Sequence, residues 1–593
     1  MSRRDRSGPG GRATELDFAM EQCRRSAGTL LLFSLAINML MLASPLYMLQ
    51  IYDRVMVTGS INTLVLLTIL TAAAMLLMGL LDALRAVLAV RMSSWLSDRL
   101  GPVYLAHCVR ARLMGDSGGA QPLRDITQIQ NFIASPALTV FFDAPWSPVF
   151  LALIWILHPA LGVLAVSSAV ILLALGLANE ATTRGATAAA NQAQINATLQ
   201  AETVIRNAEV VRAMGMLPAL TDRWRAANDA SVSASQAAGE RSSFIIGITK
   251  FARLFMQSAA LGLGAYLVLK GELSGGAMIA CSILLGRALA PVEMAMGSWR
   301  NFSVARLAFH RLKSRLHATP QERRRLALPT PTGIVAVNAV TYTPPGGRPV
   351  LHQVSFQAKP GEAIAIVGPS ASGKSTLCRL LVGVARPSGG EVRLDGSDLT
   401  HWDPEQLGRY LGYLPQDTEL FPGTVRENIA RMKGGDETAV IEAAMLAHAH
   451  EMIQRLPNGY DTPVGDGGHR LSGGQRQRIG LARAVYGVPP LIVLDEPNAN
   501  LDQQGEAALS AAIEEMKRRG STLLIVGHRP STIVQADKIL LLRDGRVEAF
   551  GPRDEVLKRL RFVASSPAPA AAPAPSPAER ITQADMPAMG PAS

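Results

Sequence analysis

The chain carries one run whose residue types and spacing could hold phosphate groups: Gly368-Pro369-Ser370-Ala371-Ser372-Gly373-Lys374-Ser375. In this pattern, successive backbone N–H groups wrap the phosphates, the lysine reaches the outer phosphates, and the serine hydroxyl ligates magnesium. An apolar, strand-like segment at 363–367 precedes the run, and a helix is expected to open at Thr376. A strand, a loop and a helix in this order predict a site for ATP and Mg²⁺.

Two acids follow a second apolar segment, with Asp495 and Glu496 placed directly after residues 491–494. We expect Asp495 to hold magnesium through water, and Glu496 to orient or deprotonate the water that attacks the γ-phosphate. Paired acids can also cap a surface helix, but the apolar run before this pair favours a buried strand. The pair is therefore a candidate for the hydrolytic centre.

Three further side chains could complete such a centre. Gln416, which follows Leu-Pro, supplies an amide that can sense the γ-phosphate or ligate its magnesium. His528 follows another apolar run, at 522–526, and could hydrogen-bond the γ-phosphate as a switch. A lone histidine at a strand end is usually structural, but its order and spacing behind Glu496 favour the catalytic role. Asp502 falls on a loop where a partner subunit could be met.

A second anion-binding surface is predicted at Leu471-Ser472-Gly473-Gly474-Gln475. A serine and two glycines at the opening of a helix combine a hydroxyl, backbone N–H groups and the positive end of the helix dipole. The chain thus has two phosphate-binding surfaces but one phosphate loop. We therefore expect two copies to pair, so that Ser472 of each copy caps the γ-phosphate held by Lys374 of the other.

The first half of the chain is predicted to cross a membrane. Apolar runs lie at 29–49, 62–81, 138–157, 160–178, 243–269 and 276–297. Several of them approach the ~20 residues that cross a bilayer as a helix. Segments 1–28, 82–137 and 180–242 each contain six Arg, whereas the loops between them contain one basic residue or none. By the positive-inside rule, this alternation predicts six spans in contact with membrane lipid and both termini in the cytoplasm.

The net charge of +11 does not indicate a nucleic-acid partner. The basic residues lie in clusters between apolar segments, and no basic stretch is interleaved with aromatic residues. Charged residues near the predicted span ends, Asp143 and the pair Asp82 and Arg85, are either functional or anchors at the interface. The residues of a substrate path are not assigned by the sequence.

The predicted fold class is a multidomain membrane protein, in which an all-α six-span domain precedes an α/β P-loop NTPase domain. The expected parts are a cytoplasmic N-terminal segment at 1–28, the transmembrane domain at 29–315, a linker at 316–332, the nucleotide-binding domain at 333–563 and a disordered Ala/Pro-rich tail at 564–593. The spans beside the two long Arg-bearing loops are expected to continue as helical stalks. Segments near 124–132 and 217–224, at the stalk tips, could contact the soluble domain.

The order of these motifs resembles the nucleotide-binding domain of an ABC transporter. With six spans ahead of it, the chain resembles a type I ABC exporter half-transporter over about residues 25–562. The resemblance implies a symmetric homodimer that ATP closes and hydrolysis opens, driving the membrane halves between inward-facing and outward-facing states. One departure concerns the adenine. The family places an aromatic residue where this chain has Pro344, which leaves Tyr342 as the candidate to stack on the base.

Four stretches, 44–55, 142–148, 207–216 and 495–502, resemble the ATPases of bacterial type I protein secretion. Within that group the chain is most similar to exporters of RTX-type metalloproteases. The resemblance implies export of an unfolded protein with a C-terminal signal across the bacterial inner membrane. It also implies two partners, a periplasmic adaptor (membrane fusion) protein and an outer-membrane channel protein. An ABC exporter of a lipid, glycan or small peptide has the same architecture and is the alternative, against which stretches 44–55 and 207–216 argue.

Overall fold

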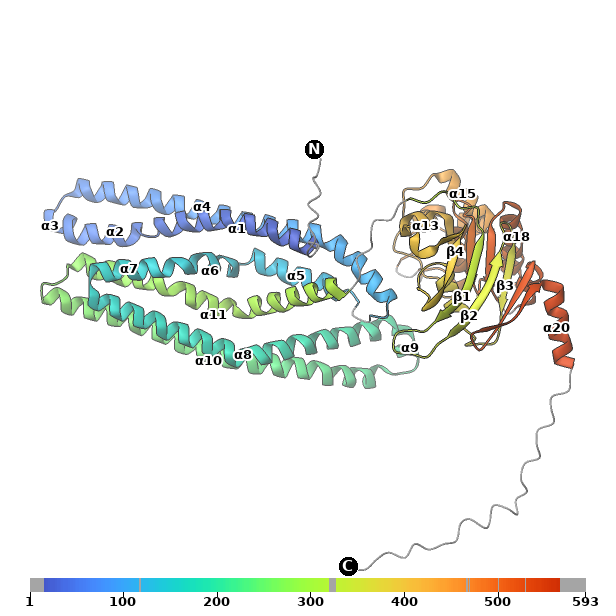
Figure 1. The fold of residues 1–593 in the computed structure, drawn as a ribbon. Helices are drawn as coiled ribbons and strands as arrows, with labels where there is room; N and C mark the ends of the chain where they lie inside the picture. Colours follow the sequence, from blue (N-terminus) through green and yellow to red (C-terminus); the bar gives the residue numbers. More distant parts are fainter. Residues whose placement is uncertain are drawn as a thin grey trace, which may run out of the picture. The chain divides into compact units, whose positions relative to one another are not determined.

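The computed structural model describes residues 15–116, 119–318, 327–465, 468, 470–499, 501–527 and 529–565. The chain divides into two compact units, Met1–Gln321 and Glu322–Ser593 (Figure 1). The described part of the first unit is helical, and the second unit combines helices with β-sheets. The predicted catalytic residue His528, about half of the predicted linker and the predicted tail from residue 566 onward lie outside the described residues.

Apolar helices dominate the first unit. They are α1 (Glu15–Leu40), α2 (Ala43–Gln50), the π-helix η1 (Ile51–Val55), α3 (Met56–Thr58), α4 (Ile61–Leu113), α5 (Gln121–Ala134), α6 (Ala137–Asp143), the 3-10 helix η2 (Ala144–Trp146), α7 (Ser147–Leu157), α8 (Pro159–Arg206), α9 (Ala208–Ala213), α10 (Leu217–Leu269) and α11 (Gly275–Ala318). Within the described residues, six helical stretches are long and apolar enough to cross a bilayer, which agrees with the predicted spans. A helix suits this setting because it pairs its own backbone groups, which lipid cannot do.

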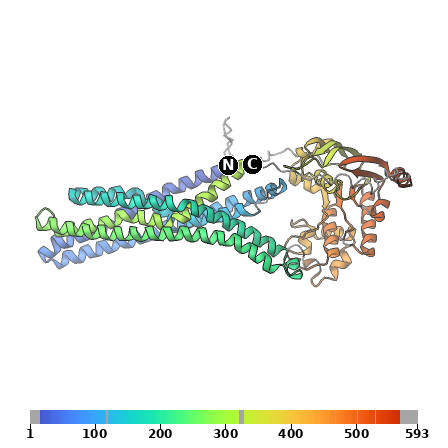
Figure 2. The ribbon, with the colours of Figure 1, turned by 90° about the horizontal axis from the view of Figure 1, so that it is seen from below.

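Several of these helices extend far beyond a bilayer. Helices α4 and α10 each contain 53 residues, and α8 contains 48, whereas ~20 residues suffice to cross the hydrocarbon core. Helices α8 and α10 lie side by side in both views (Figures 1 and 2). Ser231 of α10 donates a hydrogen bond to the carbonyl of Ala190 on α8, at 3.2 Å, inside this pair. The prediction that the spans continue as long helices is therefore confirmed.

Helices α7 and α8 form a tight hairpin at residues 158–160. His158 is extended and caps α8, because its Nδ1 accepts a hydrogen bond from the backbone N–H of Ala160 at 3.2 Å. A Cβ on Gly162 would lie 2.6 Å from the Trp155 ring, so glycine is required where the two helices meet. The hairpin thus depends on one cap and one close approach.

A buried polar cluster, which we call the Asp143 cluster, joins α1, α4 and α6. Its members are Asp143, Arg85, Ser34 and Asn38. One oxygen of Asp143, Oδ1, accepts hydrogen bonds from Arg85 at 2.8 Å, from Ser34 at 2.5 Å and from Asn38 at 3.1 Å. Arg85 also pairs with Asp82 at 2.7 Å. A charge in such a site is tolerated when it is paired and hydrogen-bonded, so the cluster fixes the relative positions of these helices.

Two sheets form the frame of the second unit. The strands are β1 (Val335–Tyr342), β2 (Leu351–Ala358), β3 (Ala363–Val367), β4 (Gly389–Leu394), β5 (Ser397–Asp398), β6 (Leu411–Leu414), β7 (Leu491–Asp495), β8 (Thr522–Val526), β9 (Lys538–Arg543) and β10 (Arg546–Pro552). Among the described residues, one sheet has the antiparallel order β2-β1-β4-β5, and the other has the order β10-β9-β3-β8-β7-β6. In the second sheet all neighbours are parallel except β9 and β10.

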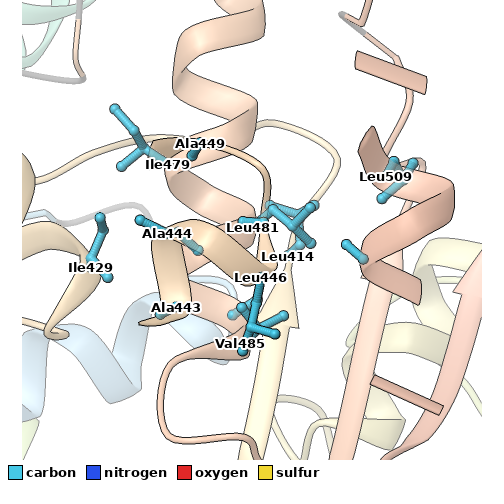
Figure 3. Packing of buried hydrophobic residues seen from close by; sticks show 14 of the residues in the cluster. Leu414, Ile429, Ala443, Ala444, Leu446, Ala449, Ile479, Leu481, Val485 and Leu509 are labelled. Carbon is cyan, nitrogen blue, oxygen red and sulfur yellow. The ribbon is translucent and has the colours of Figure 1, made fainter. Parts of the chain in front are cut away.

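Helices cover the sheets and complete the unit. They are α12 (Lys374–Leu381), η3 (Leu399–His401), α13 (Pro404–Tyr410), α14 (Val425–Ile429), α15 (Glu437–Leu446), α16 (His450–Gln454), η4 (Gly459–Asp461), α17 (Gly473–Val485), α18 (Gln503–Arg518), α19 (Pro530–Val534) and α20 (Arg553–Ser565). Strands β3, β7 and β8 are buried along their full length, as expected for parallel strands with both faces covered. One core cluster packs Leu414 of β6 with Leu481 of α17 and Leu509 of α18 (Figure 3). Because parallel strands end at the same edge of a sheet, the loops after β3, β6, β7 and β8 gather at one edge.

Candidate nucleotide site

The predicted phosphate loop connects β3 to α12. Gly373 takes a φ of 97° as the N-cap of α12, a conformation that favours glycine. A Cβ on Gly368 would lie 2.1 Å from the carbonyl oxygen of Leu542, so this glycine lets the loop pass close to β9. The Lys374 ammonium donates to the carbonyls of Gly368 and Pro369, both at 2.9 Å, and is held over the loop. Ser372 Oγ is buried and has no hydrogen-bond partner among the described residues.

Asp495 and Ser375 form the predicted magnesium site. Asp495 ends β7 with 2% of its surface exposed, and its Oδ1 has no hydrogen-bond partner within the described residues. The Ser375 hydroxyl lies near this carboxylate. Burial raises the pKa of the Asp495 carboxyl, and the nearby Ser375 hydroxyl opposes that rise. An orphaned carboxylate oxygen beside a hydroxyl fits Mg²⁺, which prefers oxygen ligands and keeps several waters.

Glu496 and Gln416 meet at the edge of the sheet. Gln416 Nε2 donates to Glu496 Oε2 at 3.1 Å, so the loop after β6 and the loop after β7 are joined by these two side chains. Glu496 has a φ of 49°, which is uncommon for a residue with a Cβ. The backbone N–H of Ala499 donates to the Glu496 carbonyl at 3.1 Å and closes the turn. The chain therefore reverses its direction at Glu496, immediately after the Asp495 carboxylate.

Gln477 is a residue of this region that the sequence did not single out. It lies on α17 with 1% of its surface exposed. Its Nε2 donates to the carbonyl of Pro497 at 3.1 Å, and its Oε1 accepts from the hydroxyl of Thr418 at 3.2 Å. The side chain thus ties the segment after Gln416 to the segment after Glu496. A glutamine on the same helix face as the buried residues 480, 481 and 484 was the available signal.

The second predicted anion surface opens α17. Ser472 is the N-cap, its Oγ accepts from the backbone N–H of Gln475 at 3.2 Å, and Gln475 Oε1 accepts from the Ser472 backbone N–H at 2.9 Å. Because a hydroxyl can accept and donate at the same time, this capping box leaves the Ser472 hydrogen available for an anion. Gly473 and Gly474 form the first turn, whose backbone N–H groups have no partner inside the helix.

The structure places Asp502 beside this surface in the same copy of the chain. Asp502 caps α18 by accepting from the backbone N–H of Gly505 at 2.8 Å, and it lies 3.6 Å from Arg478 of α17. A cavity of about 300 Å³ is lined by Met452, Ser472, Gly474, Gln475, Arg478, Leu501 and Asp502. None of these residues belongs to the phosphate loop. The cavity therefore contains the predicted anion surface at Ser472 but lacks Lys374, the lysine of the phosphate loop.

Comparison with known proteins identifies the family. The family described as ABC transporter matches residues 351–499, and the one described as ABC transporter transmembrane region matches residues 28–291. The type I secretion system ATP-binding protein PrsD of Rhizobium meliloti (strain 1021) is 40% identical over 556 residues, which are 92% of this chain and 95% of that protein. The chain belongs to the type I secretion ABC transporters.

Other similar proteins support the assignment of this chain to the ABC transporter family. The leukotoxin translocation ATP-binding protein LktB of Mannheimia glucosida is 32% identical over 89% of this chain and 76% of its own length. A solved ATP-bound bacterial Atm1-family ABC exporter has the same fold, with a TM-score of 0.81 and 24% identity, and the match covers 93% of this chain and 99% of that one. The predicted exporter fold and type I protein secretion are thus confirmed, as is ATP hydrolysis coupled to transport.

Tyr342, the predicted adenine residue of the ABC transporter, lies at the end of β1. Its carbonyl accepts from the backbone N–H of Val350 at 2.8 Å. The carbonyl of Val350 in turn lies 3.3 Å from the place that a Cβ on Gly373 would occupy. Val350 thus contacts the backbone of Tyr342 and lies close to the phosphate loop, while the half-buried Tyr342 side chain packs against the core cluster that contains Val340 and Leu351.

Proposed function

We propose that this ABC transporter acts as a symmetric homodimer in a bacterial inner membrane and moves an unfolded protein with a C-terminal signal out of the cytoplasm. The observation that carries the proposal is the 40% identity with PrsD, a type I secretion protein by name, over 92% of the chain. The relatives named for leukotoxin translocation support a polypeptide cargo. A periplasmic adaptor protein and an outer-membrane channel protein complete the route, and both termini of the transporter lie in the cytoplasm.

The homodimer explains why the cavity at Ser472 is incomplete in one copy. In the dimer, Lys374 of one copy holds the β- and γ-phosphates of ATP, and Ser472 of the other donates its free hydroxyl hydrogen to the γ-phosphate. Asp502 lies next to Ser472 and so belongs to the same shared interface. Two such sites form in a symmetric pair, because each copy supplies both surfaces.

Within each site, the chain's own residues divide the chemical work. Ser375, Gln416 and Asp495 would hold Mg²⁺, which would supply positive charge against the charge that develops on the phosphates. The loop from Gly368 to Thr376 wraps the phosphates. Glu496 orients and deprotonates the attacking water, and Gln416, hydrogen-bonded to Glu496, senses whether the γ-phosphate is present. Tyr342 stacks on adenine, and His528 acts as the γ-phosphate switch.

The secreted proteins of the source bacterium test the proposed cargo. The medium of cells with the intact gene is compared with that of cells carrying Lys374→Ala, a change that removes the cation over the phosphate loop. Export of a polypeptide predicts that one or a few proteins disappear from the medium and accumulate in the cells. An unchanged set of secreted proteins would contradict protein export and favour a lipid, glycan or small-peptide cargo.

A mixture of two inactive chains tests the shared site. Lys374→Ala and Ser472→Ala damage opposite walls of the site, so a mixed dimer contains one site with both defects and one site with neither. Co-purified mixed dimers, selected with two different affinity tags, are expected to recover part of the ATPase rate of the wild type. Mixed dimers no more active than either parent would mean that both sites must work or that the pairing is different.

A further inference from the structure

The membrane unit contains a polar cavity that the ATPase chemistry does not use. Its volume is about 600 Å³, and it lies among α8, α10 and α11. Its lining residues span 179–194 on α8, 231–246 on α10 and 296–304 on α11. The apolar runs of the same helices, at 160–178, 243–269 and 276–297, each have one end at the cavity, and they overlap its lining by no more than four positions. The cavity therefore lies where three spans leave the apolar zone, on the side of the Arg-rich loop at 180–242.

Half of the residues that line the cavity carry uncharged hydrogen-bonding side chains, namely serine, threonine, asparagine or glutamine. Arg300 is the single charged side chain among the lining residues that the structure describes, and the rest, including Ile246, Met296 and Trp299, are apolar or glycine. Arg300 donates to Ser235 at 3.3 Å. A site for a phosphate or a carboxylate would gather cations, and a site for a lipid chain would be apolar. This lining fits neither ligand.

Asn179 is a group in the cavity that calls for a ligand. It has 2% of its surface exposed, and its Oδ1 is buried with no hydrogen-bond partner among the described residues. The neighbouring hydroxyls have hydrogen-bond partners. The Thr183 hydroxyl donates to the main-chain carbonyl of Asn179 at 2.6 Å, and the Ser231 hydroxyl donates to the Gln194 side chain at 3.1 Å. A buried polar atom without a partner is unfavourable by more than most single hydrogen bonds contribute. The side-chain oxygen of Asn179 is thus left to accept a hydrogen bond from a ligand in the cavity.

We propose that this cavity binds a segment of the exported polypeptide through its main chain. Each residue of an extended peptide presents one N–H donor and one C=O acceptor, and a carboxamide can pair with both, because its oxygen accepts and its nitrogen donates. Hydroxyl and amide groups along the walls serve the neighbouring peptide groups. Since side chains of the cargo are not read, one cavity accepts many sequences. The assignment rests on the proposed function, because it requires a polypeptide cargo.

The position of the cavity gives this binding a purpose. An unfolded segment that leaves water loses hydrogen bonds to its backbone, and unpaired backbone groups are strongly unfavourable in an apolar zone. A polar pocket at the boundary supplies replacement partners before the segment passes the apolar part of the spans. Binding through the main chain holds the segment without demanding a particular sequence.

A pair of peptides tests the mode of recognition on the purified, full-length transporter. The probe is a fluorescent, unstructured peptide rich in glycine and serine, and its control is the same peptide with N-methylated backbone amides. We expect the probe to bind and the methylated control, which lacks N–H donors, to bind about tenfold more weakly. Asn179→Leu is expected to weaken the binding of the unmethylated probe by a similar factor. Asn196→Leu, the same change at an exposed position on α8 outside the cavity, is expected to leave binding unchanged.

Equal binding of the two peptides would overturn main-chain recognition, and a normal affinity in Asn179→Leu would overturn the site. Asn179→Ala, which removes the same carboxamide and leaves a smaller side chain, repeats the test if Asn179→Leu does not fold. Secretion then separates this proposal from the proposed function. If Lys374→Ala stops the export of a protein and Asn179→Leu does not, the cavity proposal fails and the exporter stands. If Lys374→Ala changes no secreted protein, the proposed function itself fails.

Discussion

Two buried aspartates in this protein have opposite surroundings. Asp143, in the membrane unit, has 8% of its surface exposed, and its Oδ1 accepts three hydrogen bonds. Asp495, in the nucleotide unit, has 2% exposed, and its Oδ1 accepts none from the described residues. Both carboxylates have lost water, so the difference is whether the chain itself supplies the replacement partners. A satisfied carboxylate holds the fold together, whereas an orphaned one is kept for a ligand.

The same contrast appears within each unit. The membrane unit contains Asp143 Oδ1, which accepts three hydrogen bonds, and the orphaned Asn179 Oδ1, whereas the nucleotide unit contains the satisfied Gln477 and the orphaned Asp495 Oδ1. Unpaired buried polar atoms are uncommon in folded proteins and each one needs a reason. Within the described residues, the orphaned side-chain oxygens are Asp495 Oδ1 in the predicted magnesium site, Ser372 Oγ in the phosphate loop and Asn179 Oδ1 in the cavity of the membrane unit. Substitutions should therefore separate the two kinds of group, orphaned ones affecting function and satisfied ones affecting stability.

The largest expected effect is on the rate of ATP hydrolysis, at the acid that follows Asp495. Glu496→Gln keeps the shape of the side chain and its contact with Gln416 but removes the general base. We expect ATP still to bind, the dimer to stay closed, and the ATPase rate to fall at least about 100-fold. Steady-state hydrolysis and trapping of radiolabelled ATP measure the two parts. Glu419→Gln, the same change at an exposed acid, serves as the control, and full hydrolysis by Glu496→Gln would remove its assigned role.

The next largest effect is on the stability of the membrane unit, at Asp143. Asp143→Ala leaves the buried Arg85 guanidinium without its main partner, so we expect the free energy of unfolding in detergent to fall by about 3–5 kcal/mol. Asp82→Ala removes the other carboxylate that contacts Arg85, but the Asp82 side chain is 60% exposed, and its loss should matter by less than about 1 kcal/mol. Thermal unfolding of the purified variants measures both. Similar losses in the two variants would contradict the distinction between buried and exposed partners.

Gln477 tests whether a satisfied group can also position a catalytic one. Gln477→Met preserves the volume but removes the bonds to Thr418 and Pro497. We expect kcat to fall several-fold, because the Gln416 and Glu496 loops lose their connection, while KM for ATP stays nearly unchanged. Gln503→Met, at an exposed position on the first turn of α18, is the control. A change in thermal stability alone, with kcat intact, would show that Gln477 is only structural.

The smallest expected effect is a pH dependence of metal binding. Because burial raises the pKa of the Asp495 carboxyl, protons begin to compete with Mg²⁺ at a higher pH than they would at an exposed aspartate. As the pH is lowered toward the raised pKa of this carboxyl, the Mg²⁺ concentration for half-maximal ATPase should rise. The Asp495→Asn variant should require more Mg²⁺ for half-maximal ATPase at every pH, and this requirement should change little with pH. An unchanged Mg²⁺ requirement in the wild type would argue against Asp495 as the ligand.

The sequence predicted the two units unequally well. The phosphate loop, the acids after β7 and the serine that opens α17 are short local patterns, so residue types and spacing were enough to find them. The six spans were also visible, because a bilayer requires long apolar runs. The partners of Asp143 were not, since Arg85 lies 58 residues away and Ser34 lies 109 residues away. Gln477 and Asn179 were missed for the same reason: only the fold reveals whether a buried amide has partners.

Helix α10 has a mechanical consequence that follows from its length. A continuous helix of 53 residues is about 80 Å long, at 1.5 Å per residue. If such a rod turns by about 5° around a point at one end, the other end moves by about 7 Å, which exceeds one helical turn. Helix α8 lies alongside it and stiffens the pair. The two helices form a lever, so a slight rotation at one end suffices for a large displacement at the other.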